Sequence, residues 1–173
     1  MSKLAGKHIA LLVEDLYEDP EFWYPYYRMK EAEAQVTVVG THKTTYESKH
    51  GYPATADMLA KQASPDAFNA VIIPGGYAPD RLRRYPEVLD FVRALYHQNK
   101  IIAFICHAGW VPISAGIVKG HRVTSFFSIK DDLINAGAEW VDEPVVRDRQ
   151  LISSRRPPDL PYFCHAILSA LAS

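Results

Sequence analysis

Four short apolar runs, separated by segments with a helical pattern, constrain the fold of this chain more than any other feature. The runs are residues 8–13, 35–40, 70–73 and 100–105. Near-continuous apolar runs are typical of strands that are buried on both faces, as in a parallel sheet. Helical segments of crossover length lie between them, at residues 21–34 and 86–98. The sequence therefore predicts an α/β fold in which helices cover both faces of a mostly parallel sheet.

The rest of the chain continues this alternation. Helical patterns cover residues 107–118, 129–136 and 158–172, and strand-like pieces lie at residues 121–127 and 144–154. Residues 41–57 are polar and predict a loop or short strands. Pro25 lies inside the first helical segment, so that helix is expected either to kink there or to begin near there. With 173 residues and no repeat or linker, residues 1–173 are expected to form a single domain.

Composition excludes several classes of function. The chain has 19 basic and 20 acidic residues, a net charge of -1, which offers no basic surface for a nucleic acid. Its longest apolar run, residues 101–106, is far shorter than a membrane span. Two cysteines, Cys106 and Cys164, form neither a disulfide framework nor a zinc motif. We therefore expect a cytoplasmic protein with no nucleic-acid or membrane partner and no metal.

Cys106 directly follows the last apolar run and precedes small residues and a helical pattern. This order predicts a sharp strand-to-helix turn that presents the thiol at the end of the sheet, as in a nucleophile elbow. A helix N-terminus beneath the thiol would lower its pKa, and free amides there would stabilise an oxyanion. His107 is placed to act as acid, base or orienting group. The alternative is an unreactive core cysteine, since free cysteine is commonly buried.

Two other predicted strand ends share this edge of the sheet, where parallel sheets bind ligands. Gly75 and Gly76 end the third strand, where glycine lets a backbone amide approach a ligand, unless the pair forms only a tight turn. Four acidic residues follow the first strand, between positions 14 and 19. One of them is expected to share a proton with the thiol, unless the run is a solvated loop or a helix cap.

An aromatic cluster occupies residues 22–27, with the sequence Phe-Trp-Tyr-Pro-Tyr-Tyr. A cluster this dense cannot face a single core, so some of its rings are expected to face a partner subunit or the mouth of the site. The alternative is a partly buried helix with scattered exposed tyrosines.

A series of short motifs, in order along almost the whole chain, resembles one known family. The motifs are Tyr17-Glu18-Asp19, Tyr24-Pro25-Tyr26, Lys49-His50-Gly51-Tyr52, Pro74-Gly75-Gly76, Ala78-Pro79-Asp80-Arg81, Ile105-Cys106-His107, Ile113-Ser114-Ala115-Gly116, Ile129-Lys130-Asp131-Asp132, Asn135-Ala136-Gly137-Ala138-Glu139, Ser153-Ser154-Arg155 and Pro158-Asp159-Leu160-Pro161. They resemble the ThiJ/PfpI superfamily, in its PfpI-like intracellular protease and deglycase branch (class I glutamine amidotransferase-like). The resemblance implies a flavodoxin-like three-layer sandwich and an activity that needs no cofactor.

The resemblance also implies roles for individual residues. Cys106 is the implied reactive residue, with Glu18 as its protonated carboxyl partner and His107 as the elbow histidine. Gly76 and the amide of His107 match the oxyanion donors. Asp80 matches an acid that, in hexameric members, reaches the histidine from the neighbouring subunit. A homo-oligomer, either a dimer or a hexamer, is therefore expected.

Several positions depart from the family pattern. Phe104 replaces the small residue that usually stands two before the cysteine, and Ala108 and Gly109 replace the common Gly and Pro. Trp110 places a large indole at or near the substrate pocket. The acid at position 80 is Asp rather than the longer Glu of some relatives. These differences bear on substrate access and on the contact between subunits.

Three functions are compatible with this pattern. The first is a cofactor-independent cysteine hydrolase or deglycase, in which the Cys106 thiolate adds to a small carbonyl such as methylglyoxal or to a glycated protein, with Glu18 or His107 moving the proton. The second is an intracellular cysteine peptidase, whose base His107 is oriented by Asp80 of another chain. The third is a redox sensor or chaperone-like stress protein, in which Cys106 is oxidised without turnover. We expect the first.

Overall fold

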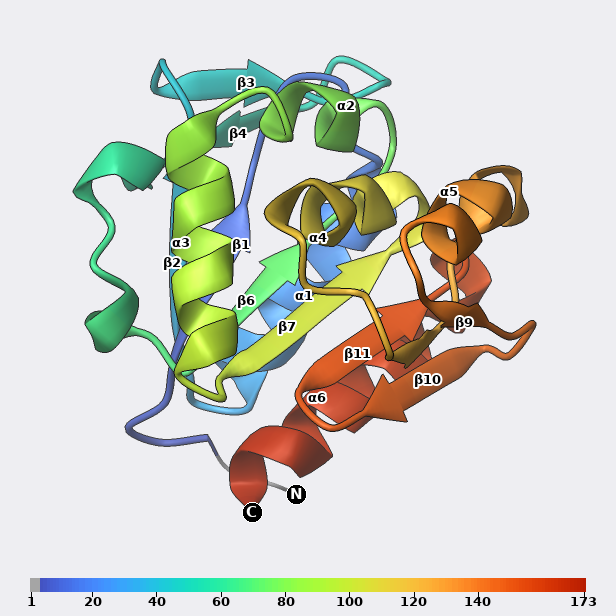
Figure 1. Ribbon diagram of the computed structural model, residues 1–173. Helices are drawn as coiled ribbons and strands as arrows, with labels where there is room; N and C mark the ends of the chain where they lie inside the picture. The colour runs from blue at the N-terminus through green and yellow to red at the C-terminus, as the bar shows by residue number, and fades with distance from the viewer. Residues whose placement is uncertain (1–3) are drawn as a thin grey trace.

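The computed structural model describes residues 4–173 of the chain. Its central sheet has seven strands in the order β10-β11-β7-β6-β1-β2-β5. Their bounds are β1 (His8–Leu12), β2 (Gln35–Gly40), β5 (Met58–Leu59), β6 (Ala70–Ile73), β7 (Ile101–Ile105), β10 (Val145–Asp148) and β11 (Leu151–Ser154). All neighbouring pairs are parallel except β10 and β11, which form an antiparallel hairpin. The predicted flavodoxin-like α/β fold is confirmed (Figure 1).

Helices cover both faces of this sheet and make three layers (Figure 1). Helices α1 (Asp19–Glu31) and α6 (Leu160–Ala172) pack on one face. The opposite face carries α2 (Ala78–Leu82), α3 (Pro86–His97), α4 (Trp110–Ala115) and α5 (Lys130–Asn135). Each face has its own apolar cluster, so the core consists of two layers of side chains, one on each side of the β-sheet.

Strand β7 shows why the apolar runs are continuous. Ile101, Ala103 and Ile105 point into the cluster under α1 and α6, whereas Ile102 and Phe104 point into the cluster under α3 and α4. All five are buried, and each large apolar side chain that is fully buried contributes about 1.5–3 kcal/mol to folding. Phe104 therefore fills the core rather than the substrate pocket, despite its departure from the family pattern.

Other predicted elements differ in detail. The polar segment 41–57 contains a hairpin of β3 (Thr45–Glu47) and β4 (Pro53–Thr55). Helix α1 begins at Asp19 and runs through Pro25, so the prediction of a start near Pro25 is wrong. The helix predicted at residues 107–118 is instead a 3₁₀ turn followed by the short α4, which ends where Gly116 adopts a φ of +73°. Within residues 121–140, only β8 (Arg122–Val123) and β9 (Glu139–Trp140) are extended.

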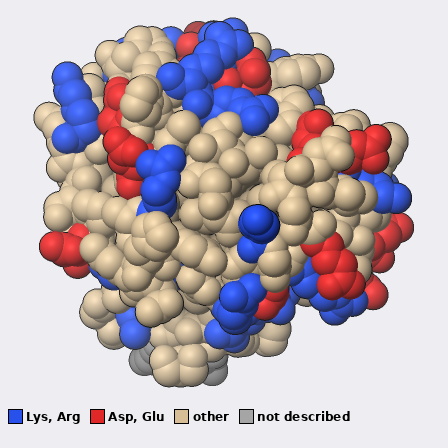
Figure 2. Space-filling model, viewed as in Figure 1, with Lys and Arg blue, Asp and Glu red and all other residues tan. Residues whose placement is uncertain are grey.

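The described part of the chain contains no helix with the length and apolarity to cross a bilayer. Basic and acidic side chains are interspersed on the face that carries α3, α4 and α5 (Figure 2). This mixing agrees with the net charge of -1 and leaves no large field of one sign on that face.

Candidate active site

Cys106 lies where β7 ends and a 3₁₀ turn, residues Cys106–Gly109, leads into α4. Its φ is +64°, a left-handed conformation that costs a non-glycine residue about 1–3 kcal/mol and is concentrated at functional sites. The residue keeps 8% of its accessible surface. The backbone amides of Gly76 and His107 face its sulfur and favour the thiolate. The structure thus contains the sharp strand-to-helix turn that the sequence predicts.

Gly75 and Gly76 fit closely against the elbow, because neither position has room for a side chain. A Cβ on Gly75 would lie 2.5 Å from Glu21 Oε1 and 2.7 Å from Cys106 Cβ. Gly76 has a φ of +80°, and a Cβ there would lie 2.5 Å from the carbonyl oxygen of Leu16. The two glycines therefore bring the end of β6 into contact with both the thiol and the segment after β1.

The carboxyl group beside Cys106 belongs to Glu21, not to Glu18 as the family resemblance implied. Glu21 is fully buried on α1, and its Oε1 accepts a hydrogen bond of 2.9 Å from the amide of Gly75. Its Oε2 is buried and has no hydrogen-bond partner among residues 4–173. Glu18 is the N-cap of α1, and its side chain pairs with Lys49 Nζ at 2.8 Å. Glu18 therefore acts on the thiol only through its charge.

The pKa of the Cys106 thiol is shifted upward, whereas the sequence predicts a downward shift. Burial, and the negative charge that Glu21 carries once it has ionised, raise the pKa of the thiol to about 12, against the opposing effect of the amides of Gly76 and His107. Burial and the charge of Glu18 raise the pKa of Glu21 to about 8. At neutral pH the thiol and the Glu21 carboxyl are therefore both protonated. A reaction at this thiol needs a base to take its proton, because burial and the Glu21 carboxyl outweigh the amides that favour the thiolate.

His107 is in position to be that base. Its Nδ1 lies 3.2 Å from Cys106 Sγ, and its Nε2 lies 3.0 Å from Ser128 Oγ. The imidazole stacks on the ring of Phe126 and meets Trp110 edge to face, with centroid distances of 5.1 and 5.3 Å. Burial, and then the charge of Lys49, lower the pKa of His107. The imidazole is therefore neutral at neutral pH and able to accept a proton.

Asp80 and Trp110 also have partners within the chain. Asp80 forms an ion pair with Arg84 one turn along, where both side chains are exposed. Trp110 Nε1 donates to Asp132 Oδ2 at 2.9 Å, which holds the indole beside His107. Trp110 therefore lies beside His107, whereas Asp80 pairs with Arg84, and its expected contact with His107 of a neighbouring subunit stays a prediction.

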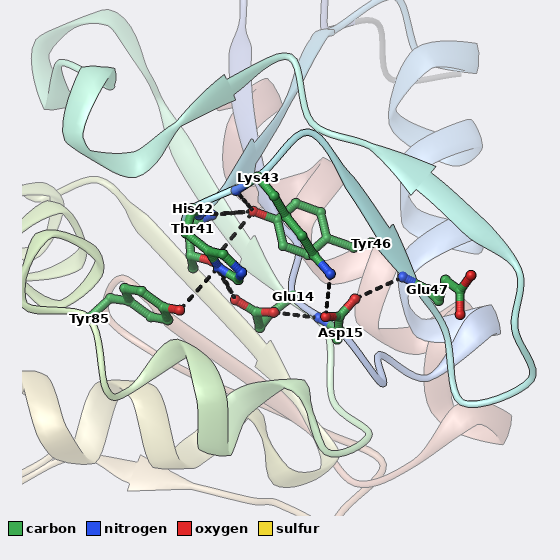
Figure 3. Close-up of polar contacts among 8 residues, drawn as sticks. All are labelled: Glu14, Asp15, Thr41, His42, Lys43, Tyr46, Glu47 and Tyr85. Atoms are coloured by element: carbon green, nitrogen blue, oxygen red, sulfur yellow. Dashed lines mark hydrogen bonds and ion pairs between the residues drawn. The ribbon is translucent and has the colours of Figure 1, made fainter.

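The four acidic residues after β1 are held by side chains of the segment that follows β2. Glu14 pairs with Thr41, Asp15 with Lys43, Glu18 with Lys49 and Asp19 with His50. Glu14 is 1% exposed, and the hydroxyl of Tyr46 accepts three backbone amides next to it (Figure 3). Glu14 is therefore neither solvated nor the proton-sharing partner of the thiol, whereas Glu18 and Asp19 lie at the N-terminus of α1, as the helix-cap alternative predicts. Glu14 forms a polar network that fixes the loops beside the site.

Only one group of possible metal ligands occurs within residues 4–173. Donor atoms of Glu18, Asp19 and His50 lie within 4.8 Å of one another. Each of these groups already has a partner, because Glu18 pairs with Lys49 and Asp19 Oδ2 accepts a hydrogen bond of 2.8 Å from His50 Nδ1. Their arrangement serves to fix the loop 48–52 against the start of α1.

Sequence reasoning missed Glu21, Lys49 and Ser128 as residues of the site. The signal for Glu21 was available, because it shares the helical period of the buried residues Phe22, Pro25 and Met29. An acid on an apolar helix face is buried and therefore carries a function or a partner. Lys49 and Ser128 reach the site from loops, and no periodicity marks them.

These groups provide the elements of an addition to a carbonyl. The neutral imidazole can accept the thiol proton, and the protonated Glu21 can donate one. The amides of Gly76 and His107 converge on the sulfur, where they can also stabilise developing negative charge.

The chain is similar to known proteins over nearly its whole length. The sequence profile of the DJ-1/PfpI family matches residues 7–170. Deglycase PfpI of Pyrococcus furiosus is 41% identical over 152 residues, which make up 88% of this chain and 92% of that protein. Protein/nucleic acid deglycase 2 of Escherichia coli is 35% identical over 171 residues, 97% of this chain and 99% of that protein.

A solved structure shows the same similarity in three dimensions. It is a two-domain protein of Anabaena variabilis with DJ-1/ThiJ/PfpI-like and ferritin-like domains, and it matches with a TM-score of 0.94 and 41% identity. The match covers 95% of this chain and 48% of that one, so this chain spans about half of the larger protein. Sequence and fold together show that the chain belongs to the DJ-1/PfpI family, as its motifs predict.

Proposed function

We propose that the protein is a cofactor-independent enzyme of the deglycase type that acts on reactive carbonyls, either free methylglyoxal or its adducts on proteins. The observation that carries the proposal is the strained elbow at Cys106, whose sulfur is surrounded by a neutral base, a protonated acid and two amides. The deglycase names of relatives at 35–41% identity support the substrate class.

The first chemical step follows from these positions. The S–H bond of Cys106 breaks and its proton passes to Nδ1 of His107. The sulfur forms a bond to the carbonyl carbon, and the π electron pair moves onto the oxygen. That oxygen takes a proton from Glu21, whose unpartnered Oε2 is available to donate it. The product of the step is a neutral thiohemiacetal, with the positive charge on His107 and the negative charge on Glu21.

A hollow beside the elbow offers room for a larger substrate. It has a volume of about 270 Å³ and is lined by Phe126, Phe127 and Arg155 together with Ser125, Asp142 and Arg156. Phe126 also stacks on His107, so the hollow begins one ring away from the base. This volume suits an amino-acid side chain that carries a carbonyl adduct, besides a free small carbonyl.

Replacing the thiol tests the proposal directly. We expect Cys106→Ser to lower the rate of methylglyoxal loss about a thousandfold or more, because the nucleophile is removed. Cys164→Ala is the matched control, since Cys164 is buried in α6 away from the elbow, and it is expected to keep the rate.

Two outcomes of this experiment would overturn the proposal. Turnover that survives in Cys106→Ser would show that the thiol is not the nucleophile. Absence of turnover in the unaltered protein, with Cys106 gaining two oxygens under mild peroxide, would favour an oxidation sensor.

The contact of 3.2 Å between Cys106 and His107 also suits a cysteine peptidase. Peptide cleavage measured beside methylglyoxal loss, at one enzyme concentration, separates the two activities. We expect turnover of methylglyoxal to be the faster, because an aldehyde carbonyl is more electrophilic than the carbonyl of a peptide bond.

A further inference from the structure

The ring of His107 is held between two polar contacts. Its Nδ1 faces Cys106 Sγ at 3.2 Å, and its Nε2 faces Ser128 Oγ at 3.0 Å. A neutral imidazole has one donor nitrogen and one acceptor nitrogen. When the proton is on Nε2, His107 donates to the hydroxyl of Ser128 and keeps the lone pair of Nδ1 directed at the thiol.

The elbow itself fixes the position of Ser128. Ser128 lies in the 3₁₀ turn Phe127–Ile129. Just before this turn, the amide of Phe126 donates to the carbonyl oxygen of Cys106 at 3.1 Å. The ring of Phe126 stacks on His107 with an interplanar angle of 28°. The segment that carries the hydroxyl is therefore attached both to the nucleophile and to its base.

We infer that Ser128 is a positioning residue for His107, supplied by the same chain, and that it takes the place of an acid from another subunit. This inference rests on the proposed function, in which His107 is the base. The proton moves from Sγ to Nδ1 while the Nε2–H bond to Ser128 stays intact. The ring therefore need not rotate as its charge appears, and the hydroxyl oxygen stabilises the imidazolium that forms.

A hydroxyl stabilises an imidazolium less than a carboxylate does, and solvent can partly replace it, because the Ser128 side chain is exposed. The expected effect is therefore moderate. One hydrogen bond of this kind corresponds to about a three- to tenfold change in rate.

The test is the rate of Cys106 alkylation by iodoacetamide as a function of pH, read by mass spectrometry of the Cys106 peptide. We expect Ser128→Ala to slow alkylation about three- to tenfold. It should also lower the pKa of His107 in an NMR titration, and Ser128→Thr should restore both. Ser64→Ala is the matched control, because Ser64 is an exposed serine with no side-chain cap bond, and it should change neither.

If Ser128 had a purely structural role, Ser128→Ala would leave the pKa of His107 unchanged. Ser128→Thr would then not restore the alkylation rate selectively. The inference is overturned if the Ser128→Ala variant has the same alkylation rate and the same His107 pKa as the unaltered protein. A slower alkylation in Asp80→Asn but not in Ser128→Ala also overturns it, because the acid of a neighbouring chain would then orient the imidazole ring. Alkylation needs no carbonyl substrate, so a failure of the proposed function leaves this result readable.

Discussion

At the scale of single residues, the proposed mechanism depends on His107 and Glu21, which are both neutral at neutral pH. Glu21 is the less expected of them, because it is a carboxyl group buried among apolar side chains with one oxygen unpartnered. Its pKa of about 8 couples the stability of the fold to pH.

The sign of this coupling follows from the direction of the shift. Between the ordinary pKa of a glutamate and about 8, the folded state holds a proton that the unfolded state has lost. We therefore expect the free energy of unfolding to fall as pH rises through this range, by up to about 1.4 kcal/mol per pH unit from this group. Glu21→Gln should remove this slope. Urea unfolding of both proteins between pH 5 and pH 9 measures it, and equal slopes would contradict the burial argument.

At the scale of elements, two strand ends and the first turn of α1 are held together without room for a side chain at Gly75. The end of β6 touches α1 through Gly75 and Glu21, and it touches the end of β7 through Cys106. Close packing of this kind transmits strain, so a small change in one element displaces the others.

Gly75→Ala tests that packing. Its methyl group would collide with Glu21, Cys106 and the carbonyl of Ile105, so we expect a loss of about 1–3 kcal/mol in stability and most of the activity. Gly116→Ala is the control, because a Cβ there meets nothing within 4 Å and its φ of +73° costs about 1 kcal/mol. Urea midpoints and methylglyoxal loss are measured for both. Full activity in Gly75→Ala would show that the contact does not position the thiol.

At the scale of the whole molecule, the residues described around Cys106 and His107 come from distant parts of the sequence. They lie in α1, after β6, in the elbow and before α5. The aromatic cluster of residues 22–27 is divided between core and surface: Phe22 is buried, whereas Tyr24 and Tyr27 are 40% and 62% exposed. A homo-oligomer built on such exposed rings remains an expectation from the family resemblance.

Because the proposed step uses only Cys106, His107 and Glu21, which belong to the same chain, we expect methylglyoxal turnover per chain to be independent of protein concentration. The protein is separated by size-exclusion chromatography, and light scattering gives the mass of each fraction. Each fraction is then assayed for methylglyoxal loss at several dilutions. Turnover confined to the assembled fraction would bring a group of a neighbouring chain into the site, with Asp80 as the first candidate.

A structural feature can be predicted from the sequence only where it produces a local pattern of residues. Buried strands leave continuous apolar runs, so β1, β2, β6 and β7 were predicted to within a residue or two. Cys106 was found because a strand end and small residues flank it. Glu21 was missed because motif matching favoured the neighbouring Glu18. Burial and the Glu21 carboxyl raise the pKa of Cys106, whereas the helix pattern predicts a lowered one, because both causes depend on tertiary packing that no local pattern records.

The pH dependence of kcat/KM for methylglyoxal tests the central claim most directly, because it reports the protonation states of the free enzyme. A neutral His107 base and a protonated Glu21 acid predict a bell-shaped profile. Its acid limb should lie below the ordinary pKa of histidine and its alkaline limb near pH 8, and Glu21→Gln should abolish the alkaline limb. A rate with no fall near pH 8 in the unaltered enzyme would contradict the account, because Glu21 would then not be the proton donor.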